Sequence, residues 1–249
     1  MGGVPTACVV NLAIRPGLRP RFFDRLYAGL GGAAEAAGVD LVGGNVTAGN
    51  ALAITIALIG ETGRSVMRRD TARPGDGIFV TGTVGDAAIG WRILAGKMRA
   101  GGAPRKFLVD RFLRPTARLA AGQRLAKMRR TPAAIDLSDG LLQDLGHILE
   151  RSGVGAELDA STIPRSQAYR AVMGDDLELA LSGGEDYELL FCLPARVSAA
   201  TLTRRLGLPV TRIGKIVRGH ATTLIDANSS PISVPSHVRG WDQLRPHKS

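Results

Sequence analysis

Strand-like and helix-like segments alternate along the whole chain, and this alternation constrains the fold more than any other feature of the sequence. Residues 7–14 form an apolar run that is rich in β-branched side chains. Residues 22–38 follow with apolar side chains at helical spacing, and residues 39–45 and 51–60 favour two further strands. The first part of the chain is therefore predicted to be a βαββ unit.

A polar segment at 61–76, with Pro and Gly near its end, predicts the connection to a second domain. The same mixture of elements continues beyond it. Strands are expected at 77–85, 132–138, 187–194 and 210–217, and helices at 86–96, 115–128, 139–151 and 198–207. We predict an α+β fold made of two α/β-type domains, the first at residues 1–61 and the second at residues 62–249.

The composition is that of a folded globular protein and argues against several functional classes. Of 249 residues, 45% are hydrophobic and 22% are charged, and the formal net charge is +10. The cations are spread along the chain and aromatics make up only 4%, too few for a stacking platform, so nucleic acid is not the expected partner. A solvated basic surface explains the charge, with anionic small ligands as the functional alternative.

Targeting and cysteine patterns point to the cytoplasm. The chain contains no uninterrupted apolar run of about 18 residues, and its start lacks a signal-peptide pattern, so we expect a cytoplasmic protein without membrane contact. Cys8 and Cys192 are the only cysteines, which argues against a disulfide framework and a zinc site.

A first candidate site lies in AIDLSDGLLQD. The strand predicted to end at Asp136 is followed by Ser138 and Asp139, either of which can cap the next helix through its side-chain oxygen. A helix N-terminus offers free N–H donors that suit a phosphate oxygen, and Asp136 and Asp139 are spaced to hold Mg²⁺. An ordinary Asp cap with a second, water-facing Asp is the alternative.

Two glycine-containing segments are further candidates. SGGEDYELLF combines two glycines with three carboxylates and a tyrosine, and forms either a surface turn or a binding loop. In LVGGN, Gly43 and Gly44 are expected to make a turn whose backbone can approach a ligand, with Asn45 offering an oxygen. A tight connection between strands is the alternative for this turn.

Several segments carry a family resemblance when they are taken in order: GVDLVGGN, RPGDGIFVTGTVGDAAIG, RPTARL, AIDLSDGLLQDLGHI, SGVGAELD, LALSGGEDYELLF and VTRIGKI. They resemble the thiamine-monophosphate kinases of the aminoimidazole ribonucleotide synthetase superfamily, from about Met1 to Trp241. SGGEDYELLF and the absence of a catalytic Cys motif disfavour other reactions of the superfamily, such as ATP-dependent ring closure or selenium phosphorylation.

The resemblance implies that ATP gives its terminal phosphoryl group to thiamine monophosphate, in line and with Mg²⁺ neutralising the phosphates, to yield thiamine diphosphate. The site residues that it implies are Asp136, Asp139 and Asn45 for the metal, Gly44, Asn45, Arg69 and Ser138 for ATP, and Glu185 and Trp241 for the thiamine phosphate. A carboxylate and an aromatic ring suit the cationic thiamine. For Asp186, Tyr187 and Glu188, structural support is the expected role.

Two departures from the family pattern are visible. Asn45 stands where the family has an aspartate, which weakens one metal site. The chain also opens beyond the counterpart of the family's acidic Gly-Asp-Asp segment and of the Asp-containing helix that follows it, so we expect an incomplete first domain, through a misplaced start codon or a true loss. The family implies a homodimer built from first-domain strands. The alternative to a working kinase is a truncated, catalytically impaired relative that binds thiamine phosphate or nucleotide, and we expect very low activity.

Overall fold

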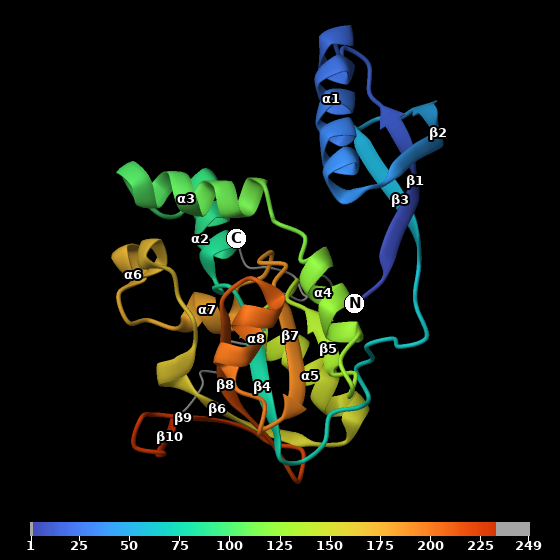
Figure 1. Ribbon diagram of the computed structural model, residues 1–249. Helices are drawn as coiled ribbons and strands as arrows, with labels where there is room; N and C mark the ends of the chain where they lie inside the picture. The colour runs from blue at the N-terminus through green and yellow to red at the C-terminus, as the bar shows by residue number, and fades with distance from the viewer. Residues whose placement is uncertain (1, 233–249) are drawn as a thin grey trace. The chain divides into compact units, whose positions relative to one another are not determined.

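The computed structural model describes residues 2–232, and the chain divides into two compact units (Figure 1). The first, called the N-terminal unit, is Gly2–Ser65, and the second, called the C-terminal unit, runs from Val66 onward. Each unit has its own sheet.

The N-terminal unit is a three-stranded sheet with one helix. β1 (Val4–Ile14) is the central strand, with β2 (Asp40–Ala48) parallel to it and β3 (Ala53–Glu61) antiparallel. α1 (Pro20–Ala37) connects the two parallel strands and lies along the sheet (Figure 1). It begins with a proline and ends where Gly38 adopts the left-handed conformation, as helix termini commonly do. The predicted βαββ order is confirmed.

The turn predicted at Gly43 and Gly44 is wrong, because both glycines lie inside β2. The register between β1 and β2 skips Val42, which marks a bulge in β2. The backbones come so close there that a Cβ on Gly44 would lie 1.8 Å from the carbonyl oxygen of Val10. The glycine is therefore required by the approach of one strand to its neighbour.

A seven-stranded sheet organises the C-terminal unit, in the order β10-β9-β6-β8-β4-β7-β5. Neighbouring strands are antiparallel except β6 and β9, which run parallel. The strands are β4 (Asp76–Thr81), β5 (Ala133–Asp136), β6 (Gly155–Asp159), β7 (Leu189–Pro194), β8 (Val210–Val217), β9 (Thr222–Ile225) and β10 (Pro231–Ile232). The helices are α2 (Asp86–Leu94), α3 (Gly102–Leu113), α4 (Leu119–Ala126), α5 (Leu141–Ser152), α6 (Gln167–Met173), α7 (Glu178–Ser182) and α8 (Ala199–Leu206), with a 3₁₀ turn at Ala160–Thr162.

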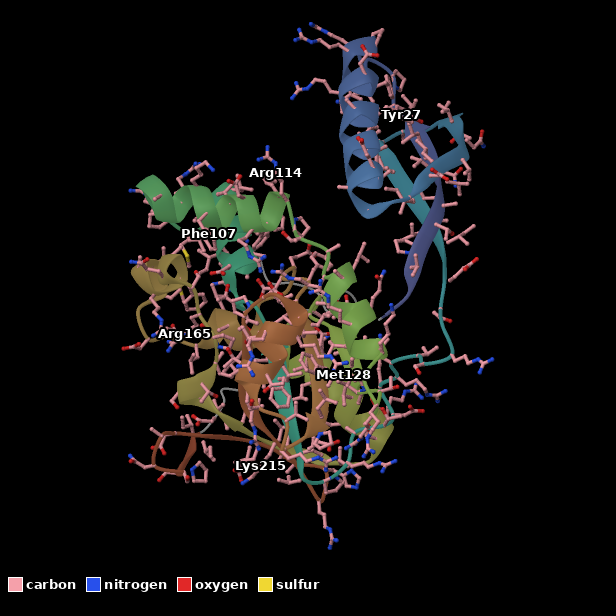
Figure 2. All side chains as sticks on the ribbon, viewed as in Figure 1. Tyr27, Phe107, Arg114, Met128, Arg165 and Lys215 are labelled. Carbon is pink, nitrogen blue, oxygen red and sulfur yellow. The ribbon has the colours of Figure 1, made fainter. Side chains whose placement is uncertain are left out.

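Helices pack on both faces of this sheet, because successive side chains of a strand point to opposite sides. Ile78 and Val80 of β4 belong to one core cluster, to which α2, α3, α5, α6 and α7 contribute. Phe79 belongs to the other, with α4 and α8, and stacks on Phe191 of β7 with ring centroids 5.6 Å apart. At the surface, Lys215 of β8, labelled in Figure 2, pairs with the carboxylate of the neighbouring strand's Glu157 at 2.6 Å.

The α+β expectation is confirmed, and so are the eight elements predicted for the C-terminal unit, although most are shorter than expected. Sequence patterns missed α3, α6, α7, β6, β9 and β10. α3 has no clear apolar stripe, since Leu108 is its one buried residue, and the other missed elements have seven residues or fewer, too few for a period to emerge.

Candidate functional site

Two of the predicted motifs lie side by side because β5 and β7 are antiparallel neighbours. The hydrogen bonding continues past the strand ends. The N–H of Glu185 donates to the carbonyl of Ser138 at 2.9 Å, and the N–H of Tyr187 donates to the carbonyl of Leu137 at 2.8 Å. We name the two joined segments the aspartate loop (residues 136–140) and the glutamate loop (residues 183–188).

Glycines allow this close contact between the loops. A Cβ on Gly184 would lie 2.3 Å from the carbonyl oxygen of Ser138, and one on Gly140 would lie 2.7 Å from that of Ser182. Gly140 also adopts a φ of 122°, which side chains disfavour. These glycines serve loop-to-loop packing.

Asp144, on the first turn of α5, holds the shape of the aspartate loop. Its Oδ2 accepts the N–H groups of Ser138, Asp139 and Gly140 at 3.0, 3.0 and 3.1 Å. Burial raises the pKa of the Asp144 carboxyl, the three donors lower it, and the nearby Asp139 carboxylate raises it. The carboxylate fixes three consecutive backbone groups at once.

The helix cap predicted at Ser138 or Asp139 is wrong. The N-cap position of α5 is Gly140, which has no side-chain oxygen. Asp144 occupies the N–H groups of Ser138, Asp139 and Gly140, so these three donors are not free for the phosphate oxygen that the sequence pattern suggested. An anion contact with these three residues must come from a side chain or through a bound cation.

A buried carboxylate anchors the glutamate loop on one side. Asp186 is 3% exposed and accepts the N–H of Gly85 at 2.5 Å and that of Ala87 at 3.2 Å, at the start of α2. Burial raises the pKa of Asp186 to about 7, against the effect of these two donors. The side chain therefore ties the loop to α2.

A second buried carboxylate, Glu188, anchors the end of the loop. Arg118 binds it through two contacts of 2.7 and 2.5 Å, Arg111 adds one of 3.2 Å, and the Thr81 hydroxyl donates at 2.6 Å. A Cβ on Gly82 would lie 2.2 Å from the Glu188 Oε1, so this side of the carboxylate also requires a glycine. A full set of donors is what offsets the cost of burying such a charge.

Glu185 and Tyr187 alternate with these two anchors and remain accessible. Glu185 is exposed and Tyr187 is half-buried, with φ values of 72° and 52°, which residues other than glycine rarely adopt. These dihedrals explain why Tyr187 and Glu188 lie outside β7, although they were expected in that strand. The Tyr187 hydroxyl donates to the Glu185 Oε2 at 3.0 Å.

The tyrosine hydroxyl lies in a negatively charged environment. Burial raises the pKa of Tyr187, and the carboxylates of Glu185, Asp136 and Asp139 raise it further. The two joined loops therefore bring Asp136, Asp139 and Glu185 together, and we call these three carboxylates the acidic surface. The phenol stays protonated at neutral pH and can act as a donor.

Carboxylate oxygens on this surface suit a hard cation. Asp139, Asp144 and His147 each offer a ligand atom within 4.8 Å of one another. Asp144 is already committed to three N–H groups, whereas Asp139 and Asp136 are half-buried side chains. Oxygen donors of this kind fit Mg²⁺, which needs few protein ligands because it keeps several waters.

The remaining predicted site residues belong to other parts of the chain. Gly44 and Asn45 belong to the N-terminal unit, where the exposed Asn45 accepts from the N–H of the next residue at 2.9 Å. The carbonyl of Arg69 accepts from the hydroxyl of Ser152, the last residue of α5, whereas the aspartate loop lies directly before the first residue of α5. The two ends of this 12-residue helix are about 18 Å apart. Trp241 lies outside the described residues.

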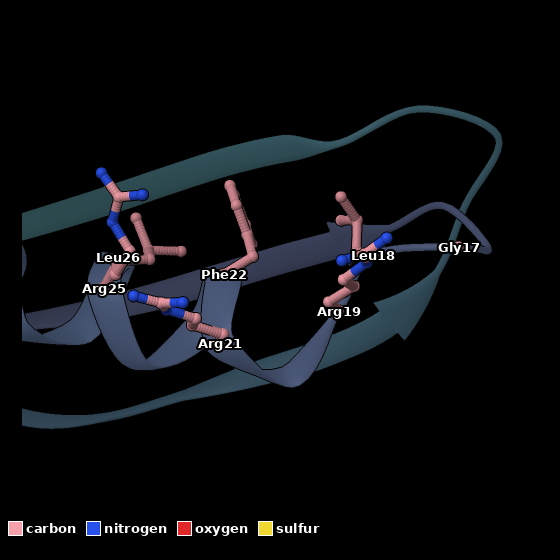
Figure 3. A pocket seen from close by; sticks show the side chains of 7 residues that line it. All are labelled: Gly17, Leu18, Arg19, Arg21, Phe22, Arg25 and Leu26. Carbon is pink, nitrogen blue, oxygen red and sulfur yellow. The ribbon is translucent and has the colours of Figure 1, made fainter.

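Two pockets contain no residue of either loop. One of about 330 Å³ is lined by Arg68, Arg69, Asp70 and Arg151. The other, of about 820 Å³, lies at the start of α1, where Arg19, Arg21 and Arg25 extend beside apolar side chains (Figure 3). All three of these arginines are exposed.

Sequence reasoning missed the residues that support the site, Asp144, Arg111, Arg118 and Thr81. Arg118 lies in RPTARL, a segment that contributes to the family resemblance but to which the sequence assigned no role. For the roles of Asp186 and Glu188, the expectation of structural support agrees with their burial and partners. The signal that the sequence offered for Asp144 is an aspartate shortly after DLSDG, among the leucines of the predicted helix.

Comparison with known proteins identifies the family. A model described as AIR synthase related protein, C-terminal domain, matches residues 73–227, and one for the N-terminal domain matches residues 1–62. The thiamine-monophosphate kinase of Aquifex aeolicus is 37% identical over 244 residues, which are 96% of this chain and 74% of that relative. The chain belongs to the thiamine-monophosphate kinase family.

Further members of the thiamine-monophosphate kinase family agree. The relative from Salmonella typhimurium is 42% identical over 185 residues, 72% of this chain, and the chain spans only 56% of that relative's length. The solved structure of AaThiL complexed with AMPPCP and TMP has a TM-score of 0.82 and 32% identity, with coverage of 98% of this chain and 75% of that one. Among residues 2–232, none of the helices combines the length and the apolar character needed to cross a bilayer.

Proposed function

We propose that this chain binds ATP and thiamine monophosphate and transfers the terminal phosphoryl group of ATP to thiamine monophosphate, giving thiamine diphosphate. The observation that carries the proposal is the joining of the aspartate and glutamate loops into one acidic surface of Asp136, Asp139 and Glu185. The thiazolium ring of thiamine is a cation, and carboxylates attract it directly. The phosphate groups of the two substrates repel one another unless cations neutralise them, and carboxylates can hold such cations. An acidic surface therefore suits both thiamine monophosphate and ATP.

The similar proteins support this substrate pair. The relatives are thiamine-monophosphate kinases, and a structure of similar fold contains AMPPCP, an analogue of ATP, together with TMP. On this chain we assign Glu185 to the cationic ring and Ser138 to the phosphates. Because Arg69 lies at the far end of α5, we assign it to a part of the nucleotide remote from the transferred phosphoryl group.

Asp136 and Asp139 fit Mg²⁺ by their oxygen donors and by their place on an accessible surface. When bound, Mg²⁺ would neutralise the phosphate oxygens on which charge accumulates during transfer. Asp144 fixes the backbone of Asp139, from which the carboxylate extends. Asn45 offers a neutral oxygen in place of the family's aspartate, and we expect it to contribute little to metal affinity.

The second candidate is a relative that binds thiamine phosphate or nucleotide with impaired catalysis. Asn45 is the observation that favours it, because each lost metal contact lowers the charge stabilisation available to the transfer. We expect very low turnover by this chain alone, with substrate binding retained in the C-terminal unit around Glu185.

We also propose self-association through the N-terminal unit. Val42, Val46, Ile56, Leu58 and Ile59 are 50–63% exposed on its strands, and exposed apolar patches mark contact surfaces. The family resemblance implies a homodimer at such strands. Multi-angle light scattering is expected to give masses above the 26.2 kDa of one chain, with irregular association. A clean monodisperse dimer would contradict the irregular association, and a clean monomer would contradict self-association altogether.

The functional test combines binding and turnover. The chain is titrated with thiamine monophosphate and with ATP plus Mg²⁺ by calorimetry, and then incubated with all three while thiamine diphosphate is quantified by chromatography. Binding with product supports the kinase, binding without product supports the second candidate, and no binding of either substrate rejects both.

A variant pair sharpens this test. Asp139→Ala should weaken Mg²⁺-dependent nucleotide binding at least tenfold, because a ligand of a phosphate-bridging cation is lost. Its melting temperature should stay nearly unchanged, since Asp139 is not the helix cap and its removal relieves repulsion on Asp144. Asp110→Ala, at an exposed ion pair of α3, is the matched control and should change neither quantity.

A further inference from the structure

Tyr187 bridges the two halves of the acidic surface through both its side chain and its backbone. Its hydroxyl donates to Glu185 at 3.0 Å, and its backbone N–H donates to Leu137 in the aspartate loop at 2.8 Å. The carboxylates of Asp136 and Asp139 lie near enough to the hydroxyl to disfavour its ionisation. No other described side chain hydrogen-bonds to the carboxylate of Glu185.

The backbone around Tyr187 is built to hold this geometry. Asp186 and Glu188 on either side are buried and bonded to α2 and to two arginines, so the residue between them cannot relax freely. Glu185 and Tyr187 both keep a left-handed φ, a conformation that persists when surroundings over-determine it and that clusters at ligand-binding sites.

A tyrosine that only packed in the hydrophobic core would not need a hydrogen bond to an exposed carboxylate. Tyr187 is half-buried, and its hydroxyl is directed to an exposed carboxylate. An exposed glutamate loses considerable side-chain freedom when it meets a ligand, and a donor that fixes it beforehand removes part of this cost.

We propose that Tyr187 is a positioning residue for the substrate: its hydroxyl holds the Glu185 carboxylate in place to receive the cationic ring of thiamine monophosphate. This proposal rests on the proposed function, because it assigns Glu185 to that ring. Tyr187 acts through Glu185 and touches neither the metal nor the transferred phosphoryl group.

A double-mutant cycle tests the proposal, with the dissociation constant of thiamine monophosphate measured by calorimetry on the 249-residue chain. Tyr187→Phe should weaken binding about five- to tenfold, and Glu185→Ala about tenfold or more. The double variant should bind no more weakly than Glu185→Ala alone, since the hydroxyl then has no side-chain acceptor left to hold. The affinity for the ATP analogue with Mg²⁺ should change less than about twofold in Tyr187→Phe.

Tyr169→Phe is the matched control. The Tyr169 hydroxyl is buried and bonds the backbone of Ala180 and Asp176 at 3.1 and 3.0 Å. Its loss should lower the melting temperature and leave the thiamine-monophosphate affinity unchanged. A loss of affinity in this control equal to that in Tyr187→Phe would overturn the proposal, because a general loss of stability would then explain both.

The outcomes separate this inference from the function beneath it. If the unaltered chain does not bind thiamine monophosphate, the proposed function fails and the inference fails with it. If the unaltered chain binds and Glu185→Ala weakens binding, but Tyr187→Phe binds normally, the function stands and the inference is wrong. Losses that multiply in the double variant would likewise overturn it, because the two residues would then act separately.

Discussion

Replacement of Asp144 shows whether a buried carboxylate holds a loop through its negative charge or through the position of its acceptor oxygen. All three of its backbone contacts, at 3.0, 3.0 and 3.1 Å, reach the single oxygen Oδ2. Asp144→Asn can place its amide oxygen at that position and keep the contacts without the charge. Asp144→Ala loses the contacts altogether and leaves three N–H groups without an acceptor.

The magnitudes differ enough to be measured. Hydrogen bonds to a charged group contribute about 1.5–3 kcal/mol each, and part of this is lost to the cost of burying the charge, so Asp144→Ala should lower the free energy of unfolding by about 3–5 kcal/mol. Asp144→Asn should cost only about 1 kcal/mol, because burial and Asp139 already disfavour the charged form. At about 2–4 °C per kcal/mol, the alanine variant should melt roughly 10 °C lower.

Urea denaturation followed by tryptophan fluorescence is a suitable assay for the C-terminal unit. The N-terminal unit ends at Ser65, and both tryptophans, Trp91 and Trp241, come after it in the sequence. Equal destabilisation by the two variants would show that the charge, and not the acceptor geometry, holds the loop. A loss below about 1 kcal/mol in Asp144→Ala would refute the reasoning as a whole.

Three further outcomes are expected. Gly184→Ala should cost about 1–3 kcal/mol of stability by urea denaturation and weaken thiamine-monophosphate binding, because its Cβ would meet the carbonyl of Ser138 at 2.3 Å; unchanged binding would contradict the contact between the loops. Arg118→Lys should cost about 2 kcal/mol in the same assay, since a lysine cannot make both contacts to Glu188; a neutral result would mean that Arg111 suffices. The raised pKa of Asp186, about 7, means that the fold favours the protonated carboxyl, so its contribution is complete below about pH 4 and is lost as the pH rises towards 7. The stability difference between the unaltered chain and Asp186→Asn should therefore change by up to about 3 kcal/mol between about pH 4.5 and 7.5, and a constant difference would show that the group is not protonated in the fold.

The sequence predicted the elements that carry strong periodicity and failed where packing between segments decides. The stripe of leucines in α5 and the β-branched run in β1 are local signals, and both elements formed as expected. Gly43 and Gly44 carry the local signal of a turn, but the approach of β2 to β1 keeps them in a strand. A pair of glycines shows that space is needed, without showing whether a ligand or a neighbouring strand occupies it.

The candidate site shows the same limit at the level of single residues. Asp139 and Glu185 were predicted from motifs separated by more than 40 residues, and only the pairing of β5 with β7 shows that they share one surface. The capping role expected for Ser138 or Asp139 belongs to neither, because the N-cap position is Gly140 and Asp144, further along the helix, reaches back to accept the N–H groups of both residues. A sequence pattern identifies possible donors and acceptors but does not show which of them are bonded to each other in the folded chain.

The three carboxylates of the glutamate loop make this point most clearly, since they stand within four residues and differ only in their surroundings. Asp186 is bound to backbone N–H groups and is held towards its neutral form, whereas Glu188 is surrounded by two arginines and a threonine. Glu185 alone faces solvent, with one hydroxyl to fix it. Two anchored carboxylates with their donors satisfied leave the third as the group on this loop that is free to meet a cationic ligand. Its role therefore depends on its neighbours as much as on its own charge.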